Sequence, residues 1–465
     1  MRLPIILLMI GAAAATMLTS GRVGRMPASD WYEISRQHIL QADLTYRMGM
    51  YLDEVMPLEE LPAVGGARQL REKAIADYER EAMTGKPNPV ALYRLGVIYG
   101  ERGYLEPARQ ALVRAATLDE EHAGLFLSLA AVYAPGEHVQ PLGPQAITRL
   151  RHQEQWLAGM VLPTYYERLG ETAAAAQART WAAGLTRQFG NRLLLLLSVY
   201  GGLGLIGLII LTIAVIRGAF LVRQEPRSVR PPLVVSWGPL DALEVVALLY
   251  FAIVGTGLLA GLLLGRVLPN ASDVVRVTVI AAQYLLATGG ALFVIWARVA
   301  GRNGRKLSIL GLRLRRPAWL AAHGVGGYAV LVVLLVLTTV LAPGGNPLGA
   351  VPGQAGERLL SMAQSVPARV ILFILICVLA PILEEIIFRG FVFPGLRRRM
   401  NMSGAVAMSA VLFALMHNNP AAMIPITLIG VVLAVLYERN LSLVPSIICH
   451  ALNNTLVFFL MLLTV

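Results

Sequence analysis

The stretch "APILEEIIFRG", Ala380–Gly390, places three ionisable side chains inside an apolar run. Glu384, Glu385 and Arg389 interrupt the segment Val370–Phe393, which is long enough to cross a bilayer because about 20 residues suffice. A charged side chain at the bilayer centre costs roughly 2.5–3.5 kcal/mol on insertion scales, so residues of this kind usually serve a function. The stretch therefore predicts a membrane helix that carries part of a functional site.

The composition of the whole chain is that of a membrane protein. Of its 465 residues, 56% are hydrophobic and only 15% are charged, which is far from soluble usage. Most of the other apolar segments approach spanning length, whereas Ala405–Met416 is short and suits a broken or tilted helix. We therefore predict an all-α fold, a polytopic membrane helix bundle. The remaining segments are Leu3–Leu18, Leu193–Ile216, Leu240–Leu264, Val275–Trp296, Leu320–Leu341, Ala421–Tyr437 and Leu443–Leu463.

The net charge of +12 follows membrane topology. Cytoplasmic loops of membrane proteins carry an excess of Lys and Arg, and here alternate loops are basic while Arg266–Val274 and Pro343–Ala368 are nearly neutral. We expect an internal N-terminus, an exoplasmic polar domain, an external C-terminus and a prokaryotic cytoplasmic membrane, with no nucleic-acid partner. The basic loops contain Arg217, Arg223, Arg227 and Arg230, then Arg298, Arg302, Arg305, Lys306, Arg313, Arg315 and Arg316, then Arg397, Arg398 and Arg399.

Four regions are expected along the chain. Residues 1–27 have a short basic start and an apolar core, and form a signal anchor or a cleaved signal peptide. Residues 28–191 form the polar domain, and 192–236 a membrane helix with a basic cytoplasmic linker. Residues 237–465 form the membrane bundle. The only cysteines, Cys377 and Cys449, lie in apolar segments, so the exported domain contains no disulfide.

The polar domain shows a 34-residue self-similarity. Helix pairs with small residues at fixed positions and tyrosine or leucine in the seam are typical of tetratricopeptide repeats, whose concave surfaces bind peptides or proteins. We predict such a repeat domain with a possible protein partner; the alternative is a generic helical bundle. The pattern consists of Leu95, Gly96, Tyr99, Gly103, Ala108, Leu112 and Ala115, a second copy at Leu129, Ala130 and Tyr133, and a slipped third at Leu162, Tyr166, Gly170, Ala175 and Ala182.

Helical spacing separates the two adjacent glutamates. At 3.6 residues per turn they point about 100° apart, so they cannot face one cavity in the same way. Arg389 follows Glu385 by four residues, the favourable arrangement for an ion pair. That pair leaves Glu384 to face a wet pocket. The alternative is that Glu384, Glu385 and Arg389 form one neutralising cluster that serves helix packing.

Two later apolar segments each carry a histidine. Phe413 and His417 are four residues apart and share a helix face, as do His450 and Asn454, whereas Asn453 lies off that face. Each residue alone has an ordinary explanation: an interfacial histidine, or an amide hydrogen bond between helices worth about 0.6–2 kcal/mol. Occurring together with the glutamates, they indicate a catalytic site within the membrane.

These residues resemble the motifs of a known family. "EEIIFR" (Glu384–Arg389), "FALMH" (Phe413–His417) and "HALNN" (His450–Asn454) are similar to the E-E-x-x-x-R, F-x-x-x-H and H-x-x-x-N/D motifs of the CPBP intramembrane proteases. This family is also called type II CAAX prenyl endopeptidase-like, ABI or lysostaphin-resistance-like. The resemblance covers about Leu240–Leu463, and the N-terminal repeat domain is an addition to the family core, which weakens any inference of prenylated substrates.

The resemblance implies a glutamic-type endopeptidase acting on a membrane protein or peptide. Glu384 is then the general base for a water that His417 helps to hold. His450 and Asn454 stabilise the oxyanion, and we expect this glutamic mechanism to need no cofactor. Burial makes a carboxylate a better base, and donors aimed at developing negative charge are usually the largest electrostatic contribution. Supporting positions are Glu385, Arg389 and Phe413.

Three other readings remain open at the level of sequence. One carboxylate and two histidines form a zinc ligand set, so Glu384, His417 and His450 could bind zinc, although there is no H-E-x-x-H pairing. A membrane receptor or scaffold with a vestigial protease bundle is the alternative function. A proton- or metal-coupled transporter would also need buried ionisable residues, but the sequence shows no inverted repeat.

Overall fold

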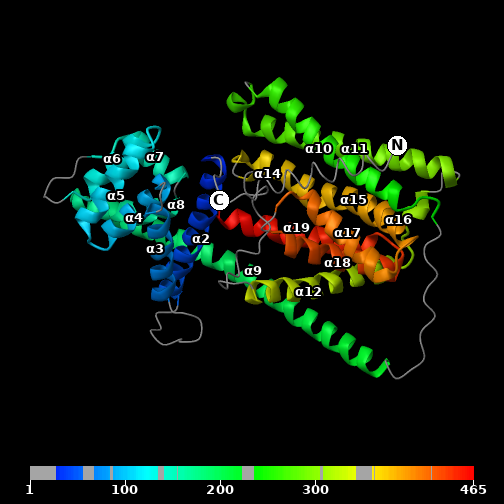
Figure 1. The fold of residues 1–465 in the computed structure, drawn as a ribbon. Coiled ribbons are helices and arrows are strands. Elements are labelled where there is room, and N and C mark those ends of the chain that lie inside the picture. The colour runs from blue at the N-terminus through cyan, green and yellow to red at the C-terminus, as the bar shows by residue number, and fades with distance from the viewer. Residues whose placement is uncertain are drawn as a thin grey trace. The chain divides into compact units, whose positions relative to one another are not determined.

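The computed structural model describes residues 28–55, 67–83, 87–134, 141–153, 155–221, 235–265, 267–303, 307–341, 359–360, 362–419 and 422–464. Within them the chain is helical and contains no strand, and it forms two compact units, 28–196 and Leu197–Leu463 (Figure 1). The predicted signal segment 1–27 and most of the predicted basic linker, 222–234, lie outside the described residues. The boundary between the units falls inside one helix, α9 (Thr172–Leu221).

The N-terminal unit is built from successive helices, most of which pack against the next one along the chain. They bury a continuous apolar core in which Tyr78, Ile98, Leu112 and Leu129 are almost fully enclosed. Their bounds are α2 (Ala28–Val55), α3 (Ala67–Met83), α4 (Pro89–Glu101), α5 (Leu105–Leu118), α6 (Ala123–Val132), α7 (Pro144–Gln153), α8 (Gln155–Arg168) and the start of α9.

The helix turns of this unit coincide with the repeat pattern. Gly103 and Gly170 have φ angles of +82° and +78°, a left-handed conformation that glycine adopts without steric cost, and each lies between two helices. Gly96 of α4 allows close packing on α5, because an added Cβ would lie 2.5 Å from Cγ of Leu112. The turns at Gly103 and Gly170 and the packing of α4 on α5 therefore agree with the pattern, and the assignment of tetratricopeptide repeats stays a prediction.

The second unit is the membrane bundle. Seven of the described helices are long and apolar enough to span a bilayer, while α17 is a shorter apolar helix, as its sequence predicts. The chain is thus an all-α, multipass membrane protein. The helices after α9 are α10 (Pro239–Leu264), α11 (Asp273–Asn303), α12 (Pro317–Leu341), α14 to α16 (together Val366–Arg397), α17 (Met402–Met416), α18 (Met423–Asn440) and α19 (Val444–Thr464), with short 3₁₀ turns η1 (Leu268–Asn270) and η2 (Leu307–Leu310).

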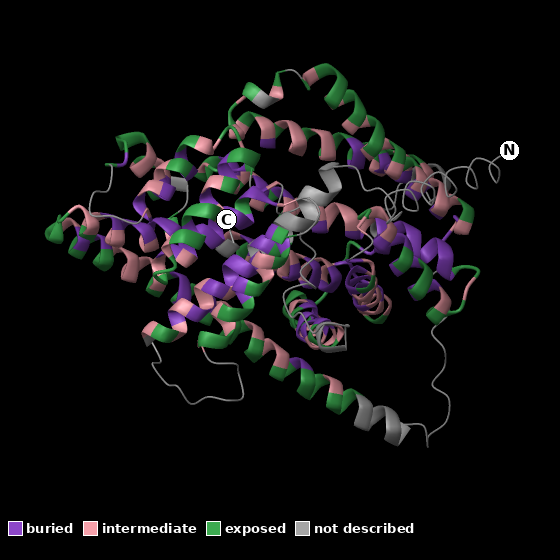
Figure 2. Ribbon diagram, turned by 60° about the vertical axis from the view of Figure 1, so that its left-hand side comes forward, coloured by how far each residue is buried: buried purple, intermediate pink, exposed green. Residues whose placement is uncertain are grey.

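Outward-facing side chains of the membrane helices are apolar. Leu262 of α10, Leu286 of α11 and Phe293 of α11 are among many large hydrophobic residues with at least half of their surface exposed, and Figure 2 shows exposed residues on these helices. Soluble monomers rarely expose contiguous apolar areas of this extent. The exposed apolar faces are consistent with helices in contact with lipid.

The helix that contains the opening motif changes its winding twice. The regular segments α14 (Val366–Phe373), α15 (Ala380–Glu385) and α16 (Phe393–Arg397) are joined by π-helical segments η3 (Ile374–Leu379) and η4 (Ile386–Val392). Such segments are rare and often occur at functional sites. Glu384 and Glu385 lie at the end of α15, between the two.

Polar contacts at its start align this helix with α11. Asp273, the first residue of α11, accepts a hydrogen bond from the backbone N–H of Ser365 at 2.6 Å, and Ser365 caps α14. The N-terminal ends of both helices, which follow the two nearly neutral loops, therefore lie together. This agrees with the predicted topology, in which both loops are on one side of the membrane.

Candidate active site

Glu385 and Arg389 form the buried ion pair that their spacing predicts. Nη1 of Arg389 lies 2.8 Å from Oε1 of Glu385, and both side chains are fully buried. Nη2 of Arg389 also donates to the carbonyl oxygen of Gly430 at 3.1 Å, and the guanidinium lies 4.5 Å from the ring centroid of Phe413. The arginine thus links the motif helix to α18 and α17. Glu385 is unavailable to solvent.

Glu384 is the accessible carboxylate of the pair. Its side chain is 19% exposed, compared with 0% for Glu385, so only Glu384 can meet a water molecule. Its Oε1 accepts a hydrogen bond of 2.9 Å from the hydroxyl of Tyr284 on α11. The division of roles between the two glutamates follows the helical geometry of the sequence: one is paired, and the other remains open.

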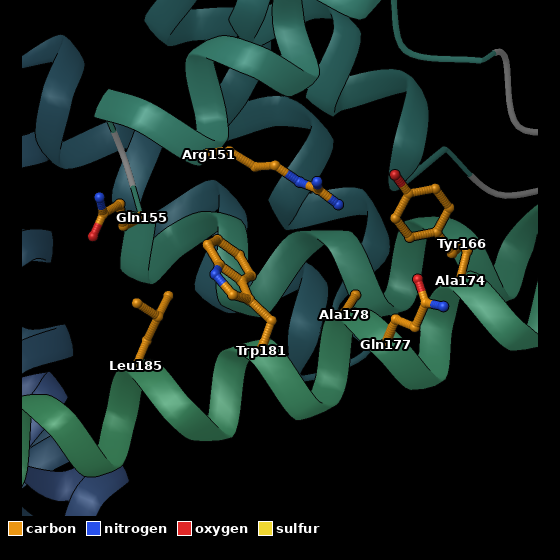
Figure 3. Close-up of a pocket in the computed structure, with 8 residues that line it drawn as sticks. All are labelled: Arg151, Gln155, Tyr166, Ala174, Gln177, Ala178, Trp181 and Leu185. Atoms are coloured by element: carbon orange, nitrogen blue, oxygen red, sulfur yellow. The ribbon is translucent and has the colours of Figure 1, made fainter.

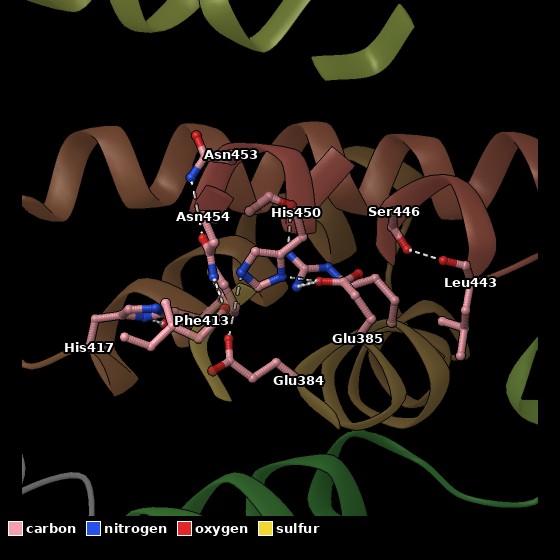
Figure 4. Close-up of polar contacts among 12 residues, drawn as sticks. Glu384, Glu385, Phe413, His417, Leu443, Ser446, His450, Asn453 and Asn454 are labelled. Atoms are coloured by element: carbon pink, nitrogen blue, oxygen red, sulfur yellow. Dashed lines mark hydrogen bonds and ion pairs between the residues drawn. The ribbon is translucent and has the colours of Figure 1, made fainter. Parts of the chain in front are cut away.

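His450 of α19 lies between the two carboxylates (Figure 4). Its Nδ1 is 3.1 Å from Oε1 of Glu385, and its Nε2 is 3.9 Å from Oε2 of Glu384. Because Oε1 of Glu385 can only accept from the ring, Nδ1 carries a hydrogen. The contact with Glu385 fixes the ring plane and directs Nε2 towards Glu384. The imidazole itself is almost fully buried.

Phe413 brings the two histidines to one region. Its ring makes edge contacts with His417 at 4.7 Å and with His450 at 5.6 Å between centroids. His417 caps the end of α17 and is exposed, and its Nδ1 donates to the backbone oxygen of Phe413 at 2.8 Å. A carbonyl oxygen can only accept, so this contact leaves Nε2 of His417 as a hydrogen-bond acceptor.

Asn454 binds a backbone carbonyl that the winding of the motif helix exposes. The N–H of Ala380 bonds five residues back to Leu375, and Pro381 has no N–H to offer the oxygen of Ile376. Nδ2 of Asn454 donates to that oxygen at 2.9 Å. Asn453, expected off this face, is buried, and its amide lies 3.5 Å from Oδ1 of Asn454.

Two features of the site were not foreseen from the sequence. Tyr284 lies 100 residues before Glu384 in the sequence. The only sign of it there is a polar group within an apolar run. The contact of His450 with Glu385 was not predicted either, because the oxyanion role expected for His450 involves only the side of the site at Glu384. Of the predicted residues, Glu384 and His450 face each other at 3.9 Å, and the ring of Phe413 connects His417 with His450.

The zinc alternative finds no ready ligand set in this arrangement. Among the described residues no three His, Cys, Asp or Glu side chains lie close enough together to hold one ion. Nδ1 of His417 is bonded to a carbonyl oxygen and Nδ1 of His450 to Glu385. Both contacts use Nδ1, whereas Nε2 of each histidine is the atom that would bind a metal in this arrangement. The observation against a zinc centre is therefore the separation of the three groups, and metal independence stays a prediction.

A separate groove lies within the N-terminal unit. Its volume is about 590 Å³, and it lies between α7, α8 and α9 (Figure 3). The guanidinium of Arg151 lies 5.9 Å from the ring centroid of Trp181, and Arg151 is the only charged residue among the described residues of the lining. The other lining residues are Gln155, Tyr166, Ala174, Gln177, Ala178 and Leu185.

The segment that carries these residues is similar to known peptidases. A family model described as type II CAAX prenyl endopeptidase Rce1-like matches residues 366–456, the segment that contains Glu384, Phe413, His417, His450 and Asn454. The chain is 32% identical over 106 residues to a protein of Bacillus subtilis (strain 168) described as "Putative membrane peptidase YdiL". That match covers 23% of this chain and 42% of the relative, so less than half of the relative is spanned. No solved structure matches the chain significantly.

Proposed function

We propose that this protein is an intramembrane endopeptidase that hydrolyses a peptide bond of a membrane-associated protein or peptide by glutamate-activated water. One observation carries the proposal: Glu384 alone of the adjacent carboxylates is accessible, and its free oxygen faces His450 across 3.9 Å. The distance is too long for a direct hydrogen bond, and a water can bridge groups at such separations. The Rce1-like match of residues 366–456 supports the peptidase part of this proposal.

The proposed reaction begins with proton transfer from water to Glu384. The resulting hydroxide adds to the carbonyl carbon of the substrate and forms a tetrahedral oxyanion. When the C–N bond breaks, Glu384 returns the proton to the departing amine, so the carboxylate is regenerated. Positioned acids and bases of this kind contribute about 10²–10⁴-fold to a rate.

The surrounding side chains provide matching donors and acceptors. Nε2 of His417 accepts a hydrogen of the water. Because Nδ1 of His450 donates to Glu385, donation to the oxyanion requires a second hydrogen on Nε2. Asn454 uses one amide hydrogen on Ile376 and has the second for the oxyanion.

The proposal predicts one accumulating precursor in cells that lack the base. Membrane fractions of cells with Glu384→Ala should contain an uncleaved protein that wild-type cells process, measured by quantitative proteomics of protein termini. Glu120→Ala is the matched control, because Glu120 is exposed on the N-terminal unit, and it should leave the pattern unchanged. Identical terminal peptides in wild-type and Glu384→Ala membranes would instead favour the receptor or scaffold function.

Metal independence is a second expected result. The purified protein in detergent micelles should cleave fluorescein-labelled casein equally well before and after treatment with a strong zinc chelator, since water activation is assigned to Glu384 itself. The chelated protein should also keep its thermal unfolding midpoint. Activity that disappears on chelation and returns with zinc would show that Glu384, His417 and His450 are zinc ligands. The oxyanion role of His450 would then be wrong.

The N-terminal unit is proposed to be exoplasmic in a prokaryotic cytoplasmic membrane. This rests on the basic loops between membrane segments. After replacement of Cys377 and Cys449, a cysteine at exposed Glu120 should react with an impermeant maleimide in intact cells. A cysteine at exposed Arg315, in the basic loop after α11, should react only after lysis. The reverse pattern would invert the topology.

The same unit is proposed to capture a partner as tetratricopeptide-like repeats do. The groove beside α9 suits an extended peptide with a carboxylate, because Arg151 is the only charged residue among its described lining residues and its two glutamine side chains can bind peptide groups. Such a partner would be a substrate presented to the membrane bundle or, under the scaffold alternative, a ligand in its own right.

A further inference from the structure

Tyr284 contacts the proposed base from outside the segment that carries the motifs. It lies on α11, whereas the family match is confined to residues 366–456. Its hydroxyl is 2.9 Å from Oε1 of Glu384, and an ionised carboxylate can only accept, so the tyrosine donates. The described structure thus assigns a specific partner to one of the two oxygens of Glu384.

The two oxygens of Glu384 have different surroundings. Oε1 is occupied by Tyr284, while Oε2 lies 3.9 Å from Nε2 of His450 without a direct hydrogen bond. Terminal carboxylate torsions are broad and roughly two-fold, so an unsupported glutamate would exchange its oxygens and swing within the space available. A donor fixed to Oε1 selects one orientation and leaves Oε2 as the oxygen that meets water.

The elements that hold Tyr284 are themselves anchored. Asp273 at the start of α11 binds the backbone at Ser365. Further along α11, Arg298 pairs with Asp241 and Glu244 of α10 at 2.6 Å each. Tyr284 lies between these contacts, near the middle of the membrane span Asp273–Val299. These contacts fix α11 on both sides of Tyr284, so its hydroxyl is held within hydrogen-bond distance of Glu384.

We propose that Tyr284 is a positioning residue that orients Glu384 so that Oε2 is the proton-accepting oxygen. The proposal rests on the general-base function of Glu384 proposed above. The groups around this carboxylate are Tyr284 from α11, His450 from α19, and Glu385 with Arg389 on its own helix. His417 of α17 joins the cluster through Phe413.

The test is Tyr284→Phe, which keeps the ring and removes the donor. With fluorescein-labelled casein as the probe, kcat should fall about 10- to 100-fold, as expected for a displaced reacting group, while KM stays within about twofold of wild type. The hydrogen bond from Tyr284 favours the ionised form of Glu384. Because the variant lacks it, the acidic limb of the pH–rate profile should move to higher pH. A helix-packing role alone would lower stability without moving this limb.

A second readout does not depend on proteolysis. The infrared band of the protonated Glu384 carboxyl group, assigned by its loss in Glu384→Gln, should appear at higher pH in Tyr284→Phe than in wild type. Tyr250→Phe is the matched control: Tyr250 is a partly buried membrane tyrosine of α10 whose ring packs on Phe251, so both the band and kcat should stay unchanged.

The outcomes separate this inference from the function on which it rests. An unmoved infrared transition, or a wild-type kcat and pH profile in Tyr284→Phe, overturns the positioning role while an inactive Glu384→Gln still upholds the protease. The positioning role is also overturned if Tyr284→Phe loses activity only in proportion to a lower folded fraction and its pH profile does not move. Full activity of Glu384→Gln on casein would refute the protease mechanism itself, whatever Tyr284 does.

Discussion

Glu384→Gln is expected to abolish peptide hydrolysis while the protein still folds and inserts. The amide cannot accept the proton of water, so the rate should fall by about 10²–10⁴-fold, the range for a lost general base. The replacement preserves the size of the side chain and an oxygen for Tyr284, so thermal unfolding in detergent should match wild type. The measurement is cleavage of fluorescein-labelled casein by the purified protein.

A second variant shows that the loss is specific to the accessible carboxylate. Glu438→Gln removes a glutamate of α18 that pairs with Arg397. Arg397 lies further along the motif helix than Glu384, and it also donates to the backbone oxygen of Met400. This variant should keep most of the activity. If Glu384→Gln retained activity similar to Glu438→Gln, another group would have to activate water, and the proposed mechanism would be wrong.

The separation of Glu384 from Glu385 could be predicted because it depends on local geometry. Residues one apart on a helix diverge and residues four apart meet, so the pair between Glu385 and Arg389 follows from the sequence alone. The structure confirms this contact at 2.8 Å. The same reasoning places Phe413 against His417, and their rings are 4.7 Å apart between centroids.

The remaining contacts depend on tertiary packing and had no local signal. Tyr284 is 100 positions from Glu384 in sequence, and no spacing rule connects them. The contact of Asn454 with Ile376 arises from the π-helical winding before Pro381, which apolar periodicity does not reveal. The proline itself is a visible signal: it removes one backbone donor, and a freed buried carbonyl needs a partner.

In the N-terminal unit too, local features could be predicted from the sequence, whereas contacts that depend on tertiary packing could not. Gly103 and Gly170 mark helix turns in the sequence, and both adopt left-handed conformations in the structure. The groove with Arg151 and Trp181 could not be foreseen, because its lining comes from three helices whose packing decides which side chains meet. The first apolar segment, Leu3–Leu18, lies outside the described residues.

Arg389→Met is expected to destabilise the membrane bundle by about 3–5 kcal/mol, the usual cost of stranding one charge of a buried pair. Among the described residues, the variant leaves the fully buried carboxylate of Glu385 with His450 as its remaining ion-pair partner. The guanidinium also binds the oxygen of Gly430, so the contact between the motif helix and α18 is weakened as well. The free energy of unfolding would be measured by detergent-induced denaturation.

The double variant Glu385→Gln/Arg389→Met tests whether a stranded charge is the cause. Removing both charges should recover much of the stability lost in Arg389→Met, because a buried pair replaced by neutral groups is often close to neutral in free energy. The coupling in the resulting double-mutant cycle should then be large, at or above the upper end of the range of about 0.5–3 kcal/mol found for residues in contact. Additive losses would show that Arg389 stabilises the fold through Gly430 and Phe413 instead. In that case Glu385 would serve mainly to orient His450, and Glu385→Gln should lower the rate of proteolysis more than it lowers stability.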